Sequence, residues 1–217
     1  MGFHDIALDA DIIFLIFKIY KLQYQEIKHF FDCLKSILRW RLLISPEVEN
    51  EIEDPFSLSL AGRLIKDGVL ERFQSSNKQE LREIAQTYND LRKTMGKGEA
   101  SCYAIAKCKG YSVLSHDHEA FSTLPPEIKG KVKWIPFYEM IYLLNREGAV
   151  SDTEAQGYLD DLGTLPNFTL PAYIQKAGFQ GIKAIYDKKY GCKKPTPKIL
   201  PPGKKRMIRI EEDPESS

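Results

Sequence analysis

The segment Ile6-Ala7-Leu8-Asp9-Ala10-Asp11-Ile12-Ile13 decides the fold class of this chain. Three consecutive apolar residues that run into Asp9 are typical of a short buried strand. Residues 12–20 are then apolar almost all round, which predicts a buried helix. The segment therefore predicts a strand followed at once by a helix, the repeating unit of an α/β protein.

The same alternation of strands and helices continues along the chain. Further short apolar runs predict strands at residues 42–44, 111–114 and 132–135. Apolar residues spaced three and four apart predict helices at residues 24–40, 46–53, 57–66, 77–95, 99–107 and 137–145. Because strands separated by helices pair in parallel, we expect a parallel sheet covered by helices on both faces.

We expect the chain to have three parts. Residues 1–147 contain the α/β domain, and residues 148–192 form a C-terminal helical extension with helices at 152–162 and 172–189. Residues 193–217 hold five prolines and seven basic against four acidic residues, which predicts a flexible tail. In this tail, Lys204, Lys205 and Arg206 would hold nucleic-acid phosphates electrostatically. A solvated tail without function is an equally open interpretation.

The composition is that of a globular protein with a core. Of the 217 residues, 43% are apolar and 28% are charged, which excludes disorder throughout. With 31 basic and 30 acidic residues, the whole-chain charge favours no class of partner. The four cysteines form no CxxC pair, so we expect reduced thiols rather than a zinc site. The most apolar stretch, residues 6–20, is too short to span a bilayer. We therefore expect a soluble cytoplasmic protein.

Four carboxylates follow or flank the predicted strands in a way that brings them together. Asp9 ends the first strand and Asp117 lies just beyond the strand at 111–114, so both belong to the carboxyl edge of the sheet. Glu99 and Glu51 lie on helix faces that also carry apolar residues. Inward carboxylates need a proton, a cationic partner or a metal. Several of them without matching Arg or Lys favour Mg²⁺ or Mn²⁺ over zinc.

A purely structural interpretation of the same acids is also open. An aspartate after a strand commonly caps the next helix, and a glutamate in a first helical turn complements the helix dipole. Placement at the strand ends raises the weight of a shared site, but the residue pattern alone does not choose between the two.

These residues resemble the motifs of PIN-domain nucleases, in the same order and over residues 5 to about 145. The resemblance rests on four stretches: the opening Ile6–Ile13 segment with its Asp-x-Asp, Ile44-Ser45-Pro46 followed by Val48 and Glu51, Gly96-Lys97-Gly98-Glu99-Ala100, and Val113-Leu114-Ser115-His116-Asp117. Ser115 stands where the family commonly has Thr, and Glu119 stands near the place of a further acid. The resemblance implies a three-layer α/β/α fold.

The resemblance also implies roles for individual residues. Asp9, Glu99 and Asp117 would be the catalytic residues and would hold one or two Mg²⁺ or Mn²⁺ ions. Supporting residues, which orient ligands or waters, would be Glu51, Asp11, Ser115 and Glu119. A metal-bound water of lowered pKa would then hydrolyse a phosphodiester in line.

Three functions follow as hypotheses. The first is a metal-dependent endoribonuclease, a toxin or an RNA-processing enzyme, for which the resemblance implies RNA, a cognate antitoxin protein and a second copy of the chain as partners. The second is a non-catalytic PIN-like module that binds nucleic acid or protein. The third, from the pair His116 and His118, is a small zinc-dependent hydrolase outside nucleic-acid biology.

Overall fold

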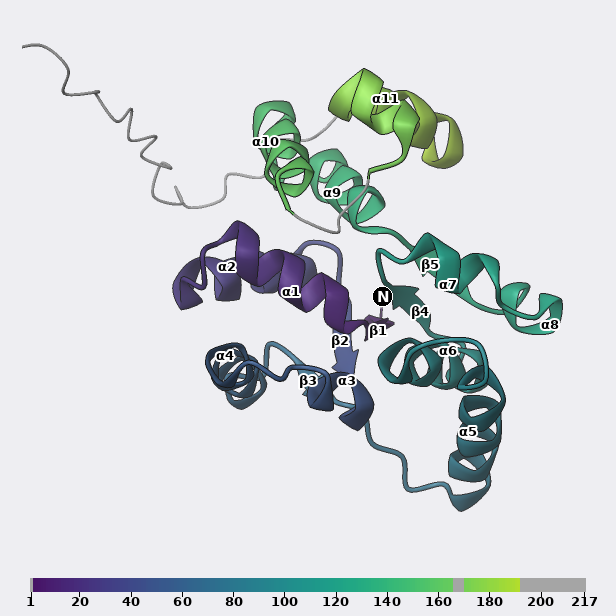
Figure 1. Ribbon diagram of the computed structural model, residues 1–217. Coiled ribbons are helices and arrows are strands. Elements are labelled where there is room, and N and C mark those ends of the chain that lie inside the picture. The colour runs from purple at the N-terminus through teal and green to yellow at the C-terminus, as the bar shows by residue number, and fades with distance from the viewer. Residues whose placement is uncertain (1, 166–169, 192–217) are drawn as a thin grey trace, which may run out of the picture.

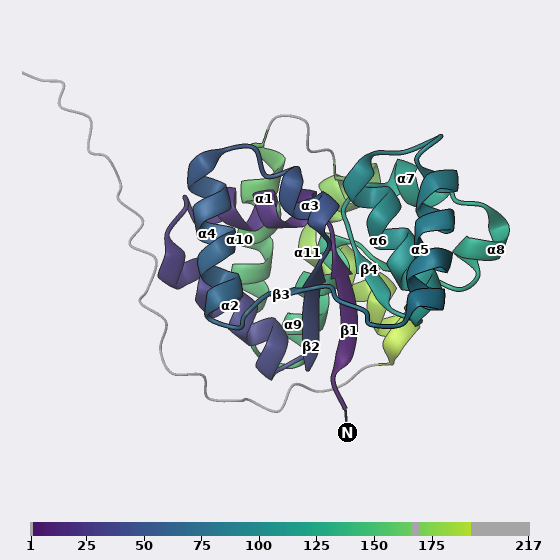
Figure 2. The same cartoon turned by 90° about the horizontal axis from the view of Figure 1, so that it is seen from below.

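The computed structural model of the chain describes residues 2–165 and 170–191, and its sheet has five strands. Their order across the sheet is β3-β2-β1-β4-β5, and every neighbouring pair is parallel. The strands are β1 (His4–Leu8), β2 (Trp40–Ile44), β3 (Glu71–Arg72), β4 (Ser112–Leu114) and β5 (Lys133–Ile135). In register, Ile6 of β1 lies between Leu42 of β2 and Ser112 of β4. Figure 2 shows β1 between the strands β2 and β4. The segments that leave β1 and β4 therefore start side by side at the carboxyl edge.

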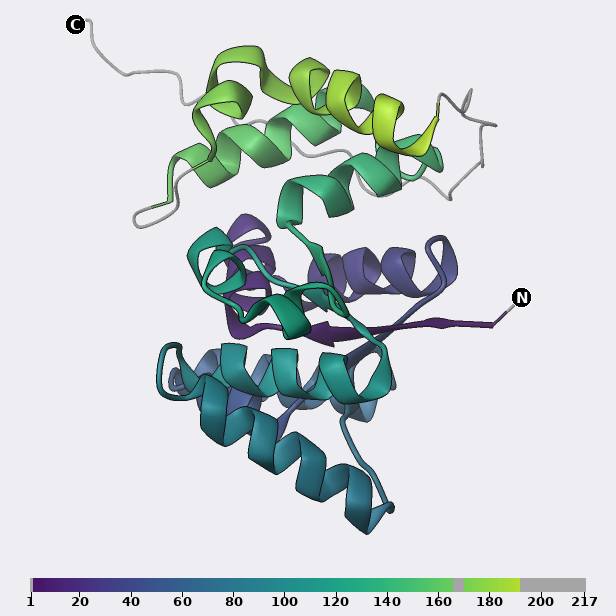
Figure 3. The ribbon, with the colours of Figure 1, turned by 90° about the vertical axis from the view of Figure 1, so that its right-hand side faces the viewer.

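Helices cover both faces of the sheet (Figures 1 and 3). On one face lie α1 (Ala10–Ile19) and α2 (Tyr24–Ser36); on the other lie α3 (Pro46–Asn50), α4 (Pro55–Lys66), α5 (Lys78–Leu91) and α6 (Lys97–Lys109). Beyond α1 and α2 stack α9 (Phe137–Arg146), α10 (Asp152–Gly163) and α11 (Ala172–Tyr190). The short helices α7 (His118–Ser122) and α8 (Pro126–Lys129) lie beside β5. The expected α/β/α architecture is confirmed.

The opening segment folds as its pattern predicts. Ile6, Ala7 and Leu8 are buried because β1 is the central strand and both of its faces are covered. Helix α1 is apolar on all sides because it lies between the sheet and α10, which it contacts. After α1, Lys21 and Leu22 adopt positive φ angles of 47° and 60° and turn the chain into α2.

Several predicted boundaries are wrong. The helix expected at 24–40 ends at Ser36, because Arg39 adopts a φ of 56° and Trp40 already belongs to β2. The helices expected at 77–95 and 46–53 also end earlier, at Leu91 and Asn50. Strand β3 was not predicted: it has two residues, both charged, at the edge of the sheet. Short α7 and α8 were not predicted either.

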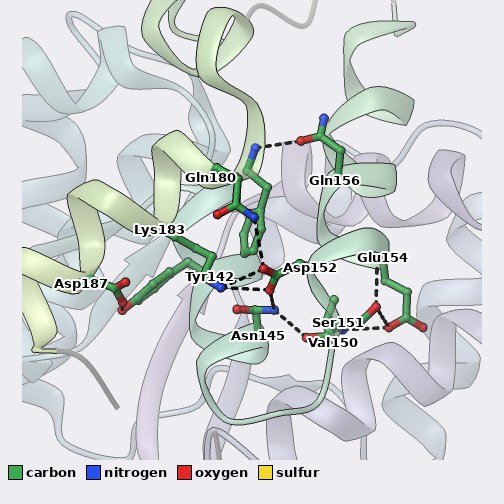
Figure 4. Close-up of polar contacts among 11 residues, drawn as sticks. Tyr142, Asn145, Val150, Ser151, Asp152, Glu154, Gln156, Gln180, Lys183 and Asp187 are labelled. Atoms are coloured by element: carbon green, nitrogen blue, oxygen red, sulfur yellow. Dashed lines mark hydrogen bonds and ion pairs between the residues drawn. The ribbon is translucent and has the colours of Figure 1, made fainter. Parts of the chain in front are cut away.

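The C-terminal helices are joined to the domain by a polar network (Figure 4). The side-chain amide of Asn145 on α9 donates to the carbonyl oxygen of Val150 at 2.8 Å and to Asp152 Oδ1 at 2.9 Å. Lys183 of α11 donates to both oxygens of the same Asp152, at 3.1 and 2.9 Å. Tyr142 of α9 reaches Asp187 of α11 at 2.8 Å. The helix predicted at 152–162 is confirmed by α10, whereas the helix predicted at 172–189 is broken by a kink at Gly178, which has a φ of 58°; both α10 and α11 pack on α9.

Other expectations are less fully tested. The division at 147/148 stays a prediction, because α10 and α11 share one buried apolar cluster with the sheet. The tail at 193–217, with Lys204, Lys205 and Arg206, lies outside the described residues. Within residues 2–165 and 170–191, no helix has both the length and the apolar composition needed to cross a membrane.

Candidate acidic active site

The fold brings together four acids from segments far apart in the sequence. Asp9 follows β1 directly and caps α1, and Asp11 lies in the first turn of that helix. Asp117 caps α7 beyond β4, and Glu99 lies in the first turn of α6. Because β1 pairs with β4 and α6 packs against both strands, the four carboxyl groups meet at the carboxyl edge of the sheet.

Asp9 is the most deeply buried of the four, with 3% of its surface exposed. Its Oδ1 accepts the backbone N–H of Ala10 at 2.9 Å, and the hydroxyl of Ser115 also bonds its carboxyl group. Burial raises the pKa of Asp9 well above its usual range, and the neighbouring charges of Asp11 and Glu51 raise it further. These two hydrogen bonds lower the pKa but do not offset the cost of burial.

Asp11 has one carboxyl oxygen in use and one free. Its Oδ2 accepts the backbone N–H of His116 at 2.8 Å, which ties α1 to the loop after β4. Its Oδ1 is buried and has no hydrogen-bond partner among the described residues. Burial, followed by the charges of Glu99 and Asp117, raises the pKa of Asp11 to about 7. A buried carboxyl oxygen without a partner is costly unless a proton or a cation meets it.

Glu99 and Asp117 share a hydrogen bond between their side chains. Each also accepts a backbone N–H: Glu99 Oε2 from Gly96 at 3.0 Å, and Asp117 Oδ1 from Ala120 at 2.9 Å. Burial, then the charge of Asp9 and next that of Asp117, raises the pKa of Glu99 to about 7. A hydrogen bond between two carboxyl groups needs a proton on one of them, and the raised pKa of Glu99 favours Glu99 as the protonated partner.

Glu51 reaches the cluster from the end of α3, and its charge acts on Asp9. It forms the C-cap of α3, and its Oε1 accepts the backbone N–H of Gly98 at 2.7 Å. A Cβ atom on Gly98 would lie 2.2 Å from Glu51 Oε2, so this close approach requires glycine. The contact with Glu51 could not be inferred from the sequence, because it joins positions 47 residues apart.

Ser115 and Glu119 differ in their relation to the acids. Ser115 is fully buried, and its Oγ also accepts the backbone N–H of Asp117 at 3.1 Å, so it orders the loop between Asp9 and Asp117. Glu119 is exposed on α7 and is not among the main charges that act on Asp9, Asp11 or Glu99. The structure therefore brings Ser115 into the cluster but not Glu119.

The two histidines of the His-Asp-His sequence have different neighbours. The ring of His116 lies 6.3 Å from that of Tyr138, and the ring of His118 lies 5.6 Å from that of Trp134. The two rings therefore lie against different elements, that of His116 against Tyr138 on α9 and that of His118 against Trp134 on β5. The geometry gives no support to a zinc hydrolase built on the pair.

The donor chemistry of the cluster suits a hard divalent cation. All the ligand atoms are carboxyl oxygens, and none of the main contributions to the raised pKa values of Asp9, Asp11 and Glu99 comes from Lys or Arg. In the described part of the chain, however, no three His, Cys, Asp or Glu side chains are arranged to hold a metal ion. Asp9, Glu99 and Asp117 each turn one oxygen toward a helix N-terminus, so the capping roles left open by the sequence are present. The agreement with Mg²⁺ or Mn²⁺ is therefore one of donor chemistry and not of geometry.

Comparison with known proteins gives no match to a family model and no match to a curated protein. The solved structures to which the chain is similar include three with low sequence identity. These are VapBC2 from Rickettsia felis bound to a promoter DNA fragment (12% identity, 61% of this chain, 98% of that chain, TM-score 0.42), DNA-bound VapBC from Salmonella typhimurium (17%, 61%, 98%, 0.42), and PAE2754 from Pyrobaculum aerophilum (15%, 67%, 97%, 0.34). The first two likenesses cover 61% of this chain and the third covers 67%.

Proposed function

We propose that this protein is a Mg²⁺- or Mn²⁺-dependent endoribonuclease. The observation that carries the proposal is the convergence of Asp9, Asp11, Glu99 and Asp117 at the carboxyl edge of a parallel sheet. The pKa values of Asp9, Asp11 and Glu99 are raised, and no Lys or Arg is among the main contributions to these shifts. Buried carboxyl groups without basic partners need protons or a cation. Perturbed carboxylates gathered at a strand edge are typical of active sites.

The side chains have distinct roles in this proposal. Asp9, Glu99 and Asp117 would hold the cation, and Asp11 Oδ1, which is buried without a partner among the described residues, would hold a water or a further ligand. Ser115 keeps Asp9 and the loop of Asp117 in place through its hydroxyl. Glu51 fixes the start of α6 and therefore Glu99. When bound, the divalent ion would lower the pKa of a water molecule and stabilise charge on the scissile phosphate.

The proposed partners are RNA, a cognate antitoxin protein and a second copy of the chain. All three come from the PIN-domain resemblance and are part of the proposal. The sequence of motifs that carries the resemblance includes all four acids of the cluster. A toxin of a toxin–antitoxin pair and an RNA-processing enzyme are both consistent with it. The alternative, a PIN-like module that binds without cutting, is favoured by the helix-capping roles of Asp9 and Asp117.

The test is cleavage of end-labelled single-stranded RNA with Mg²⁺, with Mn²⁺ and with chelator. The proposal expects cleavage with either ion, none in chelator, and a loss of at least a hundredfold in Asp9→Asn and Glu99→Gln, about the effect of removing one important electrostatic contact at an active site. Glu80→Gln, on α5 and paired with Lys109 instead of with acids, is the matched control and keeps its activity. Binding of RNA without cleavage at any metal concentration would instead identify the module.

A further inference from the structure

A row of aromatic rings and a lysine lies beside the acidic cluster. The rings of Phe121 on α7 and Trp134 on β5 are stacked, with centroids 5.0 Å apart and planes at 13°. His118 lies edge-on to Trp134 at 5.6 Å, and the ammonium of Lys129 lies 5.0 Å from the centroid of Phe121. We call these four residues the aromatic stack. None of them is buried.

The aromatic stack is attached directly to the loop that carries Asp117. The indole Nε1–H of Trp134 donates to the carbonyl oxygen of Ser115 at 3.0 Å. The backbone N–H of Phe121 donates to the carbonyl oxygen of Asp117 at 3.4 Å, so Phe121 lies one helical turn beyond this acid. A ligand on the stack therefore lies next to the carboxylate cluster.

The position of the aromatic stack is unusual for core residues. It belongs to the edge strand β5 and to a helix of five residues, and half-buried rings there leave apolar surface in contact with water. The Lys129 ammonium lies over the ring of Phe121 and also donates a hydrogen bond to the carbonyl oxygen of Ser122 at 3.3 Å. Single-stranded nucleic acid is bound by flat aromatic faces, through base stacking, and by nearby cations, through phosphate contacts.

We propose that the aromatic stack is a nucleobase-binding subsite for single-stranded nucleic acid. A base stacks on the face of Phe121 that Lys129 now covers, and the Lys129 ammonium moves to an adjacent phosphate. The strand held in this way passes Asp117 and the other acids. This inference rests on the proposed nuclease function, which gives the bound strand its purpose. It adds a site to the basic tail residues that the sequence suggested for the same ligand.

Tryptophan fluorescence tests the proposal without catalysis. The chain has two tryptophans, and Trp40 is buried with 5% exposed, so Trp40→Phe makes Trp134 the sole reporter. A short oligouridylate is titrated in chelator at low salt, beside an abasic sugar–phosphate oligomer of the same length and charge. We expect quenching by the oligouridylate and much less by the abasic strand, because only the former has bases to stack.

Variants identify the ring that does the stacking. In the same titration Phe121→Ala should bind the oligouridylate about tenfold more weakly, the size of one lost base–aromatic contact, and should bind the abasic strand unchanged. Phe121→Leu, which keeps apolar bulk but has no flat face, should lose as much, so a folding defect is not the cause. Phe56→Ala removes another exposed ring, on α4, and should bind like the parent. Lys129→Gln should reduce the salt dependence of binding by one phosphate contact.

The outcomes separate this inference from the proposed function. Equal quenching by both oligomers, or unchanged binding by Phe121→Ala, would overturn the subsite even if the parent protein cuts RNA. Base-dependent quenching with no cleavage under any metal condition would support the subsite and remove the nuclease. No response of Trp134 to either oligomer would overturn the subsite and leave this patch to a protein partner.

Discussion

Asp117 has two roles, as the cap of helix α7 and as a member of the acidic cluster. One of its oxygens accepts the N–H of Ala120 and starts α7, and its side chain also bonds Glu99 and adds to the charge that Asp11 experiences. Asparagine retains an oxygen that caps a helix but has no negative charge. Substitution therefore separates the two roles.

For Asp117→Asn we expect loss of Mg²⁺-dependent cleavage together with a higher melting temperature than the parent in chelator. Relief of repulsion should stabilise the variant by about 1–2 kcal/mol, typical of removing one unfavourable buried contact. Added Mg²⁺ should raise the melting temperature of the parent more than that of the variant, because only an intact native site gains from the ligand.

Asp54→Asn is the matched control for that measurement. Asp54 caps α4 through the N–H of Ser57 at 2.7 Å, and this bond holds the pKa of Asp54 below its usual value. Loss of its charge should lower the melting temperature slightly and leave the Mg²⁺ response unchanged. If Asp117→Asn behaves like Asp54→Asn, the carboxylate is only a helix cap.

Gly98→Ala tests the junction between α3 and α6. The added Cβ would meet Glu51 Oε2 at 2.2 Å, so Glu51 must leave the N–H of Gly98. Because the end of the Glu51 side chain can move aside, we expect only the loss of its hydrogen bond, about 0.5–1.5 kcal/mol, offset in part by the helix preference of alanine. Cleavage should be slower because Glu51 no longer holds the start of α6. Gly62→Ala, on α4 with open space around it, should instead stabilise the protein by up to about 1 kcal/mol. Urea unfolding of both variants measures this; equal effects would exclude a special role for Gly98.

At the scale of elements, α10 and α11 depend on the polar network around Asn145. This side chain is 9% exposed and holds both Val150 and Asp152 (Figure 4). Asn145→Ala should cost about 2 kcal/mol in unfolding free energy, because a buried carbonyl oxygen and a carboxylate each lose a donor. Gln180→Ala removes an exposed contact with the same Asp152 and should cost no more than about 0.5 kcal/mol. Hydrogen exchange should show α10 opening first in the Asn145 variant; uniform exchange across the chain would contradict this role.

The elements also show how far local pattern determines this fold. Four of the five strands and the long helices follow from apolar periodicity, because burial on the sheet or in a helical layer is what the pattern records. The end of α2 at Ser36 could not be predicted in this way. The chain turns toward β2 at Arg39, whose φ is positive although the residue is not a glycine. Strand β3 consists of Glu71 and Arg72 and exists only because β2 offers backbone partners.

The same limit applies to the candidate site. Asp9, Glu99 and Asp117 could be placed from the sequence, because each stands at the end of a strand or the start of a helix. The use of Asp11 through the His116 N–H could not, because it depends on a contact 105 positions along the chain. Nor could the stacking of Phe121 on Trp134, which needs the packing of α7 beside β5. Long-range contacts of this kind leave no periodic signal.

At the scale of the whole molecule, the acidic cluster makes stability depend on pH. Asp11 and Glu99 have pKa values raised to about 7, against about 4 in an unfolded chain, so the folded state binds more protons between these values. Stability in chelator should therefore be greatest near pH 5 and should fall as the pH rises through about 7. Groups with lowered pKa values, such as Glu49 and Asp152, oppose this only at lower pH.

Melting curves between about pH 5 and pH 8 measure this dependence. Saturating Mg²⁺ should flatten it, because the cation replaces the protons. Asp11→Asn should flatten it as well, by removing one of the titrating groups. A parent and an Asp11→Asn variant with the same pH profile would show that the cluster does not control stability.

Calorimetric titration of Mg²⁺ at about pH 8 shows whether these carboxylates form a site for a divalent ion. At this pH the acids with pKa values of about 7 are mostly ionised. We expect saturable binding of Mg²⁺ to the parent and to Asp54→Asn, and no binding to Asp9→Asn. Equal heats from all three proteins, or none from the parent, would contradict this expectation.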